Sequence, residues 1–99
     1  MRCPRISVII LNMNGKEVLN DCLCSIQRID YPNYDVIVVD NGSSDGSQTF
    51  IANSFPDVRL IENKSNLGVP EGQNIGIQAA LQSGADYVCL LYTSDAADE

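Results

Sequence analysis

An unbroken run of β-branched residues at positions 36–39 (Val-Ile-Val-Val) ends abruptly at Asp40 and is followed by a turn of Asn, Gly and Ser residues. Such a run is typical of a strand buried on both faces, as in the parallel sheets of α/β proteins. Ligands of these sheets bind beyond the carboxyl ends of the strands. We therefore expect Asp40 at a ligand-binding edge. The alternative is that Asp40 and Asn41 only form a turn and cap the next helix.

Strand and helix patterns alternate along the chain. Strands are predicted at residues 6–11, 35–39, 58–62 and 85–91, and helices with an apolar face at residues 16–26, 47–54 and 70–83. Strands that alternate with helices form βαβ units with right-handed crossovers, which places the strands in one parallel sheet. The predicted fold is α/β with the order β-α-β-α-β-α-β, in one small domain, which is all that 99 residues can form.

Charge and cysteine content exclude several classes of function. Thirteen acidic and six basic residues give a net charge of −7, and no Lys/Arg cluster offers a nucleic-acid-binding surface. No apolar run is long enough to span a membrane, and the first residues lack the apolar core of a signal peptide. The four cysteines have no C-x-x-C spacing and the chain has no His, which argues against a zinc site and a Ser-His-Asp triad. We expect free thiols in a reducing compartment.

Three polar loops follow the first three strands and should meet at one edge of the sheet. Their polar and glycine positions are Asn12, Asn14 and Gly15, then residues 40–45, then residues 63–68, which lead to Gly72 and Asn74. None has the spacing of a dinucleotide fingerprint or a P-loop. Each has a structural alternative: a helix cap for Asn14, a turn for Asp45, and positive φ or close packing for Gly68 and Gly72.

Four ordered segments resemble the amino-terminal part of a family 2 glycosyltransferase, an inverting enzyme with a GT-A fold and a nucleotide-sugar donor. They are ISVIILNMNG at residues 6–15, LCSI and YP within residues 23–32, VVDNGSSDGS at residues 38–47, and NLG and GQNIG within residues 66–76. The likeness covers residues 6–88. The form of the first loop is similar to that of the rhamnosyltransferase-like branch, although many relatives have an aromatic residue where Met13 stands here.

The resemblance implies the Rossmann-like nucleotide-binding half of a GT-A fold, truncated here. The parent protein would act in polysaccharide biosynthesis, transferring a sugar from a nucleotide-diphosphate sugar to a glycan or lipid-linked acceptor. The implied nucleotide-sugar-binding residues are Leu11, Asn12, Asn14, Asp40, Gly72 and Asn74. The implied location is the cytoplasm, or the inner face of the membrane for a full-length protein. The alternative function is a small self-contained α/β nucleotide-binding or interaction module without catalysis.

The end of the chain departs from the family pattern. The family continues with a D-x-D-like carboxylate pair that holds a divalent metal, Mn or Mg, against the donor diphosphate. Asp95 and Asp98 have the wrong spacing, so we expect the metal ligands, the general base and the acceptor site to be absent from this chain, and the chain itself to be inactive. Residues 89–98 also look like a translated transposon-derived sequencing adapter. We therefore expect a domain at residues 1–88 and a foreign tail at residues 89–99, frayed from Tyr92.

Overall fold

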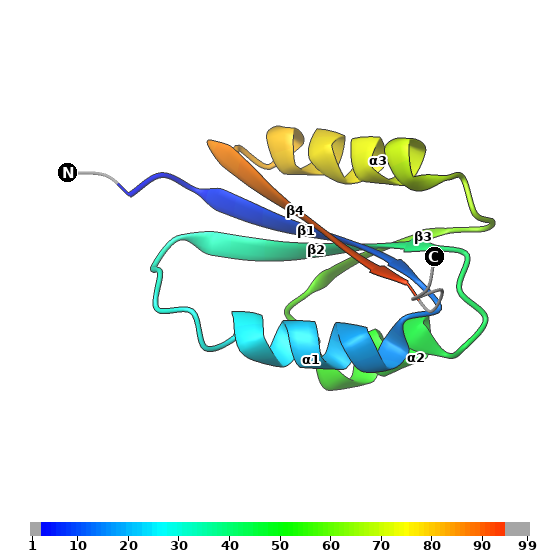
Figure 1. The fold of residues 1–99 in the computed structure, drawn as a ribbon. Helices are drawn as coiled ribbons and strands as arrows, with labels where there is room; N and C mark the ends of the chain where they lie inside the picture. Colours follow the sequence, from blue (N-terminus) through cyan, green and yellow to red (C-terminus); the bar gives the residue numbers. More distant parts are fainter. Residues whose placement is uncertain (1–2, 95–99) are drawn as a thin grey trace.

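The computed structural model of the chain describes residues 3–94. In this range the elements follow the predicted order: β1 (Ile6–Met13), α1 (Lys16–Ile26), β2 (Tyr34–Asn41), α2 (Ser47–Ser54), β3 (Arg59–Asn63), α3 (Val69–Gln82) and β4 (Tyr87–Ser94) (Figure 1). The bounds of α1 and α2 are as predicted. Both β1 and β2 extend two residues further at their carboxyl ends than predicted, so the polar residues Asn12, Asp40 and Asn41 lie inside strands.

The four strands form one parallel sheet in the order β3-β2-β1-β4, which confirms the predicted α/β fold. Helix α3 covers one face of the sheet, and α1 and α2 cover the other (Figure 1). Because side chains alternate along a strand, β1 contributes to both cores. Ile9 and Leu11 pack with α3, whereas Val8 and Ile10 pack with α1 and α2. The result is a three-layer sandwich in which β1 and β2 are buried on both sides, whereas the side chains of β4 at residues 87–92 are exposed.

Two glycines on α3 allow this helix to approach the sheet closely. A Cβ atom added at Gly72 would lie 2.5 Å from Leu11 Cδ1, and one added at Gly76 would lie 2.4 Å from Ile9 Cγ2. Real Cβ atoms do not approach other carbon atoms so closely, so a larger residue would force either α3 or the Leu11 and Ile9 side chains to shift. The close-packing alternative for Gly72 is therefore confirmed.

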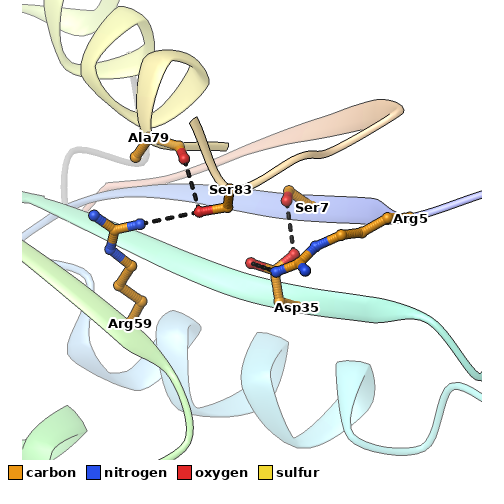
Figure 2. Close-up of polar contacts among 6 residues, drawn as sticks. All are labelled: Arg5, Ser7, Asp35, Arg59, Ala79 and Ser83. Atoms are coloured by element: carbon orange, nitrogen blue, oxygen red, sulfur yellow. Dashed lines mark hydrogen bonds and ion pairs between the residues drawn. The ribbon is translucent and has the colours of Figure 1, made fainter. Parts of the chain in front are cut away.

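Side chains near the amino ends of the strands hold the opposite end of the sheet together (Figure 2). The Ser7 hydroxyl donates a 2.6 Å hydrogen bond to Asp35, its register partner on β2, and the Arg5 guanidinium lies 3.5 Å from the same carboxylate. Arg59 on β3 donates to the Ser83 hydroxyl at 3.3 Å, just after α3. These contacts join β1 to β2 and β3 to α3, well away from the carboxyl ends of the strands.

Strand β4 continues to Ser94 and pairs in parallel with β1 along its whole length. The predicted frayed end is therefore wrong for residues 92–94, because backbone pairing does not depend on which side chains the segment carries. Residues 95–99, on which the predictions for Asp95 and Asp98 fall, lie outside the described residues. Within the described range the four cysteines are free, and none of the helices is long and apolar enough to cross a membrane.

Candidate functional site

The strand order places a topological switch point at the carboxyl end of β1. From β1 the chain builds the sheet in one direction through β2 and β3 and then adds β4 on the other side. In open α/β sheets, ligands bind in the crevice at such a switch point, outside the carboxyl ends of the strands. This rule points to the ends of β1 and β4, where Asn12 is the register partner of Thr93.

Asp40 lies beneath this edge and is completely shielded from solvent. Its carboxylate accepts three hydrogen bonds, from Asn12 Nδ2 at 2.8 Å, from the backbone N–H of Ser43 at 2.9 Å and from Gln48 Nε2 at 2.6 Å. The bond to Ser43 shows that Asp40 shapes the turn after β2, but the helix-capping part of this alternative is wrong, because the N-cap of α2 is Gly46. With three protein donors and no exposed surface, the carboxylate orients its neighbours.

Asn12 is also fully buried and joins three strands. Its Nδ2 donates to Asp40 on β2 and to the Ser43 hydroxyl at 3.2 Å, while its Oδ1 accepts a 2.7 Å hydrogen bond from the Thr93 hydroxyl on β4. Gly15 closes over this group, since a Cβ atom there would lie 3.0 Å from Thr93 Oγ1. The buried amide therefore fixes the relative positions of the ends of β1, β2 and β4.

Asn14 connects the first loop to the second and remains half exposed. Its backbone N–H donates to Ser43 Oγ at 2.8 Å, and its Oδ1 accepts from the backbone N–H of Ser44 at 2.8 Å. These reciprocal bonds hold Asn14 in the left-handed region, at φ 53°, which non-glycine residues rarely occupy. The helix-cap alternative for Asn14 is wrong, because the N-cap of α1 is Gly15 and the Asn14 side chain accepts from Ser44 instead.

Asp45 ties the second loop to the start of α1. It accepts hydrogen bonds from the backbone N–H of Lys16 at 3.1 Å and of Ser47 at 3.0 Å, and from the Ser47 hydroxyl. Partial burial works against the charged form, but the hydrogen bonds from Ser47 and Lys16 outweigh it and hold the pKa of this carboxyl below its ordinary value. The turn-forming alternative for Asp45 is confirmed.

Asn41 is buried on the opposite face of the sheet from Asp40, because neighbouring residues of a strand point in opposite directions. Its Oδ1 accepts hydrogen bonds from Asn63 Nδ2 at 3.0 Å and from the Leu67 N–H at 3.2 Å. Its Nδ2 donates to Asn66 Oδ1 and to the Gly68 carbonyl, both at 3.1 Å. Asn41 thus holds the third loop in place by hydrogen bonds, as Asp40 holds the first two.

The structure brings together most of the predicted site residues, in two groups. Asn12, Asn14 and Asp40 belong to one hydrogen-bonded group, and Leu11 packs against Gly72 on the α3 face. Asn74 stands apart: it is exposed and lies two residues from Gly72, about 200° around the helix. The face of α3 that carries Asn74 therefore points away from the sheet.

Four residues with structural roles at the edge were not among the predicted binding residues. They are Asn41, Ser43, Gln48 and Thr93. Strand alternation was the available signal for Asn41, since it places consecutive polar residues at a strand end on opposite faces. Gln48 and Thr93 could not be inferred from spacing, because each reaches the edge from an element whose position depends on the tertiary fold.

The described residues do not fit a divalent metal ion. Residues 3–94 contain no group of three or more His, Cys, Asp or Glu side chains placed to hold one. The two carboxylates of the second loop, Asp40 and Asp45, already accept hydrogen bonds from protein donors. We accordingly assign no step of a reaction to a metal held by these residues.

Comparison with known proteins finds sequences that are similar to most of this chain. The profile of the family described as Glycosyl transferase family 2 matches residues 7–96. An uncharacterized glycosyltransferase of Haemophilus influenzae is 32% identical over 98 residues, which are 96% of this chain and 38% of the relative. A GalNAc(5)-diNAcBac-PP-undecaprenol beta-1,3-glucosyltransferase of Campylobacter jejuni is 29% identical over 93% of this chain and 30% of the relative.

A solved structure shares the fold. The mannosyltransferase PcManGT from Pyrobaculum calidifontis, in complex with GDP-Man and Mn2+, superposes with a TM-score of 0.73 at 29% identity, over 80% of this chain and 25% of that one. The chain thus spans between a quarter and two fifths of the length of these similar proteins.

Proposed function

The chain belongs to glycosyl transferase family 2, and from this membership we propose that it is the nucleotide-sugar-binding part of an inverting glycosyltransferase. The parent enzyme would transfer a sugar from a nucleotide-diphosphate sugar to a glycan or lipid-linked acceptor. The observation that carries the proposal is the convergence of the first two loops on the buried Asn12–Asp40 pair at the carboxyl edge of the sheet. The complex of the similar mannosyltransferase with GDP-Man supports this donor class.

At this edge, half-exposed residues would contact the nucleotide, and buried residues would hold them in position. Asn14 and Ser43 are half exposed and offer polar atoms at the edge, while Leu11 is fully buried beneath Gly72 on the α3 face. Asn12 and Asp40 lie beneath and hold the two loops in register. In this arrangement Asp40 would act on the nucleotide through Ser43 and Asn12, because its own oxygens already accept hydrogen bonds from protein groups.

We propose that the parent enzyme takes its divalent metal, Mn or Mg, from residues other than those described here. The support is the Mn2+ in the complex of the similar mannosyltransferase and the lack of a ligand set within residues 3–94. The 99-residue chain would then bind a nucleotide weakly and without a metal requirement, and would not transfer a sugar. An acidic chain without a metal gains little from a diphosphate, since like charges repel.

Donor binding to the purified chain tests this function. UDP-glucose, GDP-mannose and a nucleotide-linked rhamnose should be titrated with and without Mn or Mg, beside the free sugars. We expect weak binding of nucleotides alone, unchanged by metal, with no sugar transfer or donor hydrolysis above background. A preference for the rhamnose donor would support the rhamnosyltransferase-like branch, for which the form of residues 11–15 is the reason. A chain that binds no nucleotide would instead be an interaction module, contrary to the proposal.

We further propose that the native family sequence is interrupted at about Cys89. The support is the likeness of residues 89–98 to a translated sequencing adapter, although the family match itself continues to residue 96. Reading the source locus past codon 88 tests this. A longer open frame with a D-x-D-like pair would support the proposal, and the same eleven codons in independently prepared genomic DNA would refute it.

A further inference from the structure

We propose that Asn41 is the positioning residue that fastens the third loop, residues 63–68, to the nucleotide-binding edge. That the ligand is a nucleotide rests on the proposed function, whereas the attachment of the loop rests on the hydrogen bonds of the structure alone. Asn41 is 2% exposed, and both atoms of its amide group make two hydrogen bonds each. All four partners belong to the third loop: Asn63, Asn66, Leu67 and Gly68. No other described side chain at this edge is so completely committed to a single loop.

The chemistry of the four partners fixes which way the amide points. The Leu67 N–H can only donate, so the atom of Asn41 that faces it must be the oxygen. The Gly68 carbonyl can only accept, so the atom that faces it must be the nitrogen. An aspartate of the same shape would place a carboxylate oxygen about 3 Å from the oxygens of Asn66 and Gly68. The site therefore selects asparagine over aspartate.

Two glycines show independently that the loop is seated against this part of β2. A Cβ atom at Gly42, the next residue after Asn41, would lie 2.8 Å from the backbone carbonyl carbon of Ser65. A Cβ atom at Gly72 would lie 3.2 Å from Asn41 Nδ2. The loop and the first turn of α3 thus close directly over the amide. The side chains of residues 64–67 are exposed, so burial of the loop's own side chains does little to hold it.

Asp40 and Asn41 together organise all three loops from one strand end. Asp40 points toward α2 and orders the first and second loops through Asn12 and Ser43, whereas Asn41 points toward α3 and orders the third. A nucleotide that lies across the edge would meet a third loop whose position Asn41 has already set. Preorganised loops bind more tightly because less conformational entropy is lost on binding.

The test combines amide hydrogen exchange with nucleotide affinity in the full chain. The variants are Asn41→Asp and Asn66→Ala, with Asn53→Asp as the matched control because Asn53 is exposed on α2. Asn66→Ala removes one acceptor of the Asn41 amide at an exposed position. It therefore still tests the attachment of the loop if Asn41→Asp does not fold. Slow exchange at Ile37 and Val38, which lie in the buried part of β2, reports that the sheet is intact.

We expect both loop variants to speed exchange of the Leu67 amide, which donates to Asn41 Oδ1, roughly tenfold and to weaken UDP or GDP binding by a similar factor, with no change in Asn53→Asp. Unchanged protection of Leu67 in both variants would overturn the proposal, as would lost protection with an unchanged dissociation constant. Weaker binding with Leu67 still protected would also overturn it, because Asn41 would then contact the nucleotide itself. If the wild-type chain binds neither UDP nor GDP, the proposed function fails, and the exchange data still decide whether Asn41 positions the loop.

Discussion

Removal of the Asp40 carboxylate should destabilise the chain more than any other single change at the edge. In Asp40→Ala, the donors of Asn12, Ser43 and Gln48 lose their acceptor at a position with no solvent exposure. A hydrogen bond to a charged group is worth roughly 1.5–3 kcal/mol, and losses within one network are not additive. We expect a loss of about 3–5 kcal/mol, a large part of the roughly 5–15 kcal/mol that holds a small domain folded.

Asp40→Asn should cost much less, about 1–2 kcal/mol, because the network can rearrange. One amide atom of the new side chain would face a donor. Asn12 can relieve this conflict by turning its amide, since its other two partners, the Ser43 and Thr93 hydroxyls, can either donate or accept. The difference between the two substitutions therefore measures the adaptability of the Asn12–Thr93 pair.

Urea unfolding followed by circular dichroism gives both values, with Asp57→Ala as the control because Asp57 is exposed. The control should lie within about 0.5 kcal/mol of the wild type. An Asp40→Ala chain within about 1 kcal/mol of the wild type would refute the role assigned to the carboxylate. Equal losses for Asp40→Ala and Asp40→Asn would refute the rearrangement of Asn12.

Three further outcomes follow from the packing and the ionisable groups. Gly76→Ala should cost about 1–3 kcal/mol in urea unfolding, because its Cβ would lie 2.4 Å from Ile9 Cγ2 and 3.1 Å from Val39 Cγ2, two side chains with no room to move; an unchanged midpoint would contradict the close approach of α3. The folded-state pKa of Asp45 lies below its ordinary value of 3.8, so the stabilising effect of the carboxylate is present above that pH and is lost as the pH falls through the folded-state pKa. The wild type should therefore lose more stability on acidification than Asp45→Asn. Parallel pH profiles of the two proteins would show that the hydrogen bonds of Asp45 do not favour its charged form. Burial and, to a smaller degree, Cys89 raise the pKa of the Cys22 thiol above 9.0, so at pH 8 iodoacetamide should modify Cys22 more slowly than the exposed Cys24, as mass spectrometry of the peptides would show.

The fold was predictable because its signals are local and repeated. The apolar run at residues 36–39 and the amphipathic pattern of residues 16–26 depend on burial, which leaves a clear trace in the sequence. The apolar pattern stops two residues before the ends of β1 and β2, because the backbone ladder continues through polar residues once their side chains have partners on the neighbouring strand. Likewise, Tyr92 and Thr93 join β4 through backbone pairing, to which side-chain patterns are a weak guide.

The candidate site was predictable as an edge but only partly as a set of side chains. Parallel strands end together, so the convergence of the three loops followed from topology. The roles of the individual side chains did not follow from topology, because their hydrogen-bond partners come from distant parts of the chain. Gln48 reaches Asp40 from α2, and Thr93 reaches Asn12 from β4. One sequence motif contains both Asn74 and Gly72, but two positions along a helix place them on opposite faces.

A chemical-shift map of the labelled chain with UDP or GDP tests the central claim, that the nucleotide binds at the carboxyl edge of the sheet. We expect the largest amide shift changes in residues 12–15 and 42–44, around the Asn12–Asp40 pair. A cavity of about 340 Å³ at the other end of the sheet, lined by Leu23, Tyr34 and Val58 among others, provides the internal comparison. Shift changes centred on that cavity, or none at saturating nucleotide, would contradict the account.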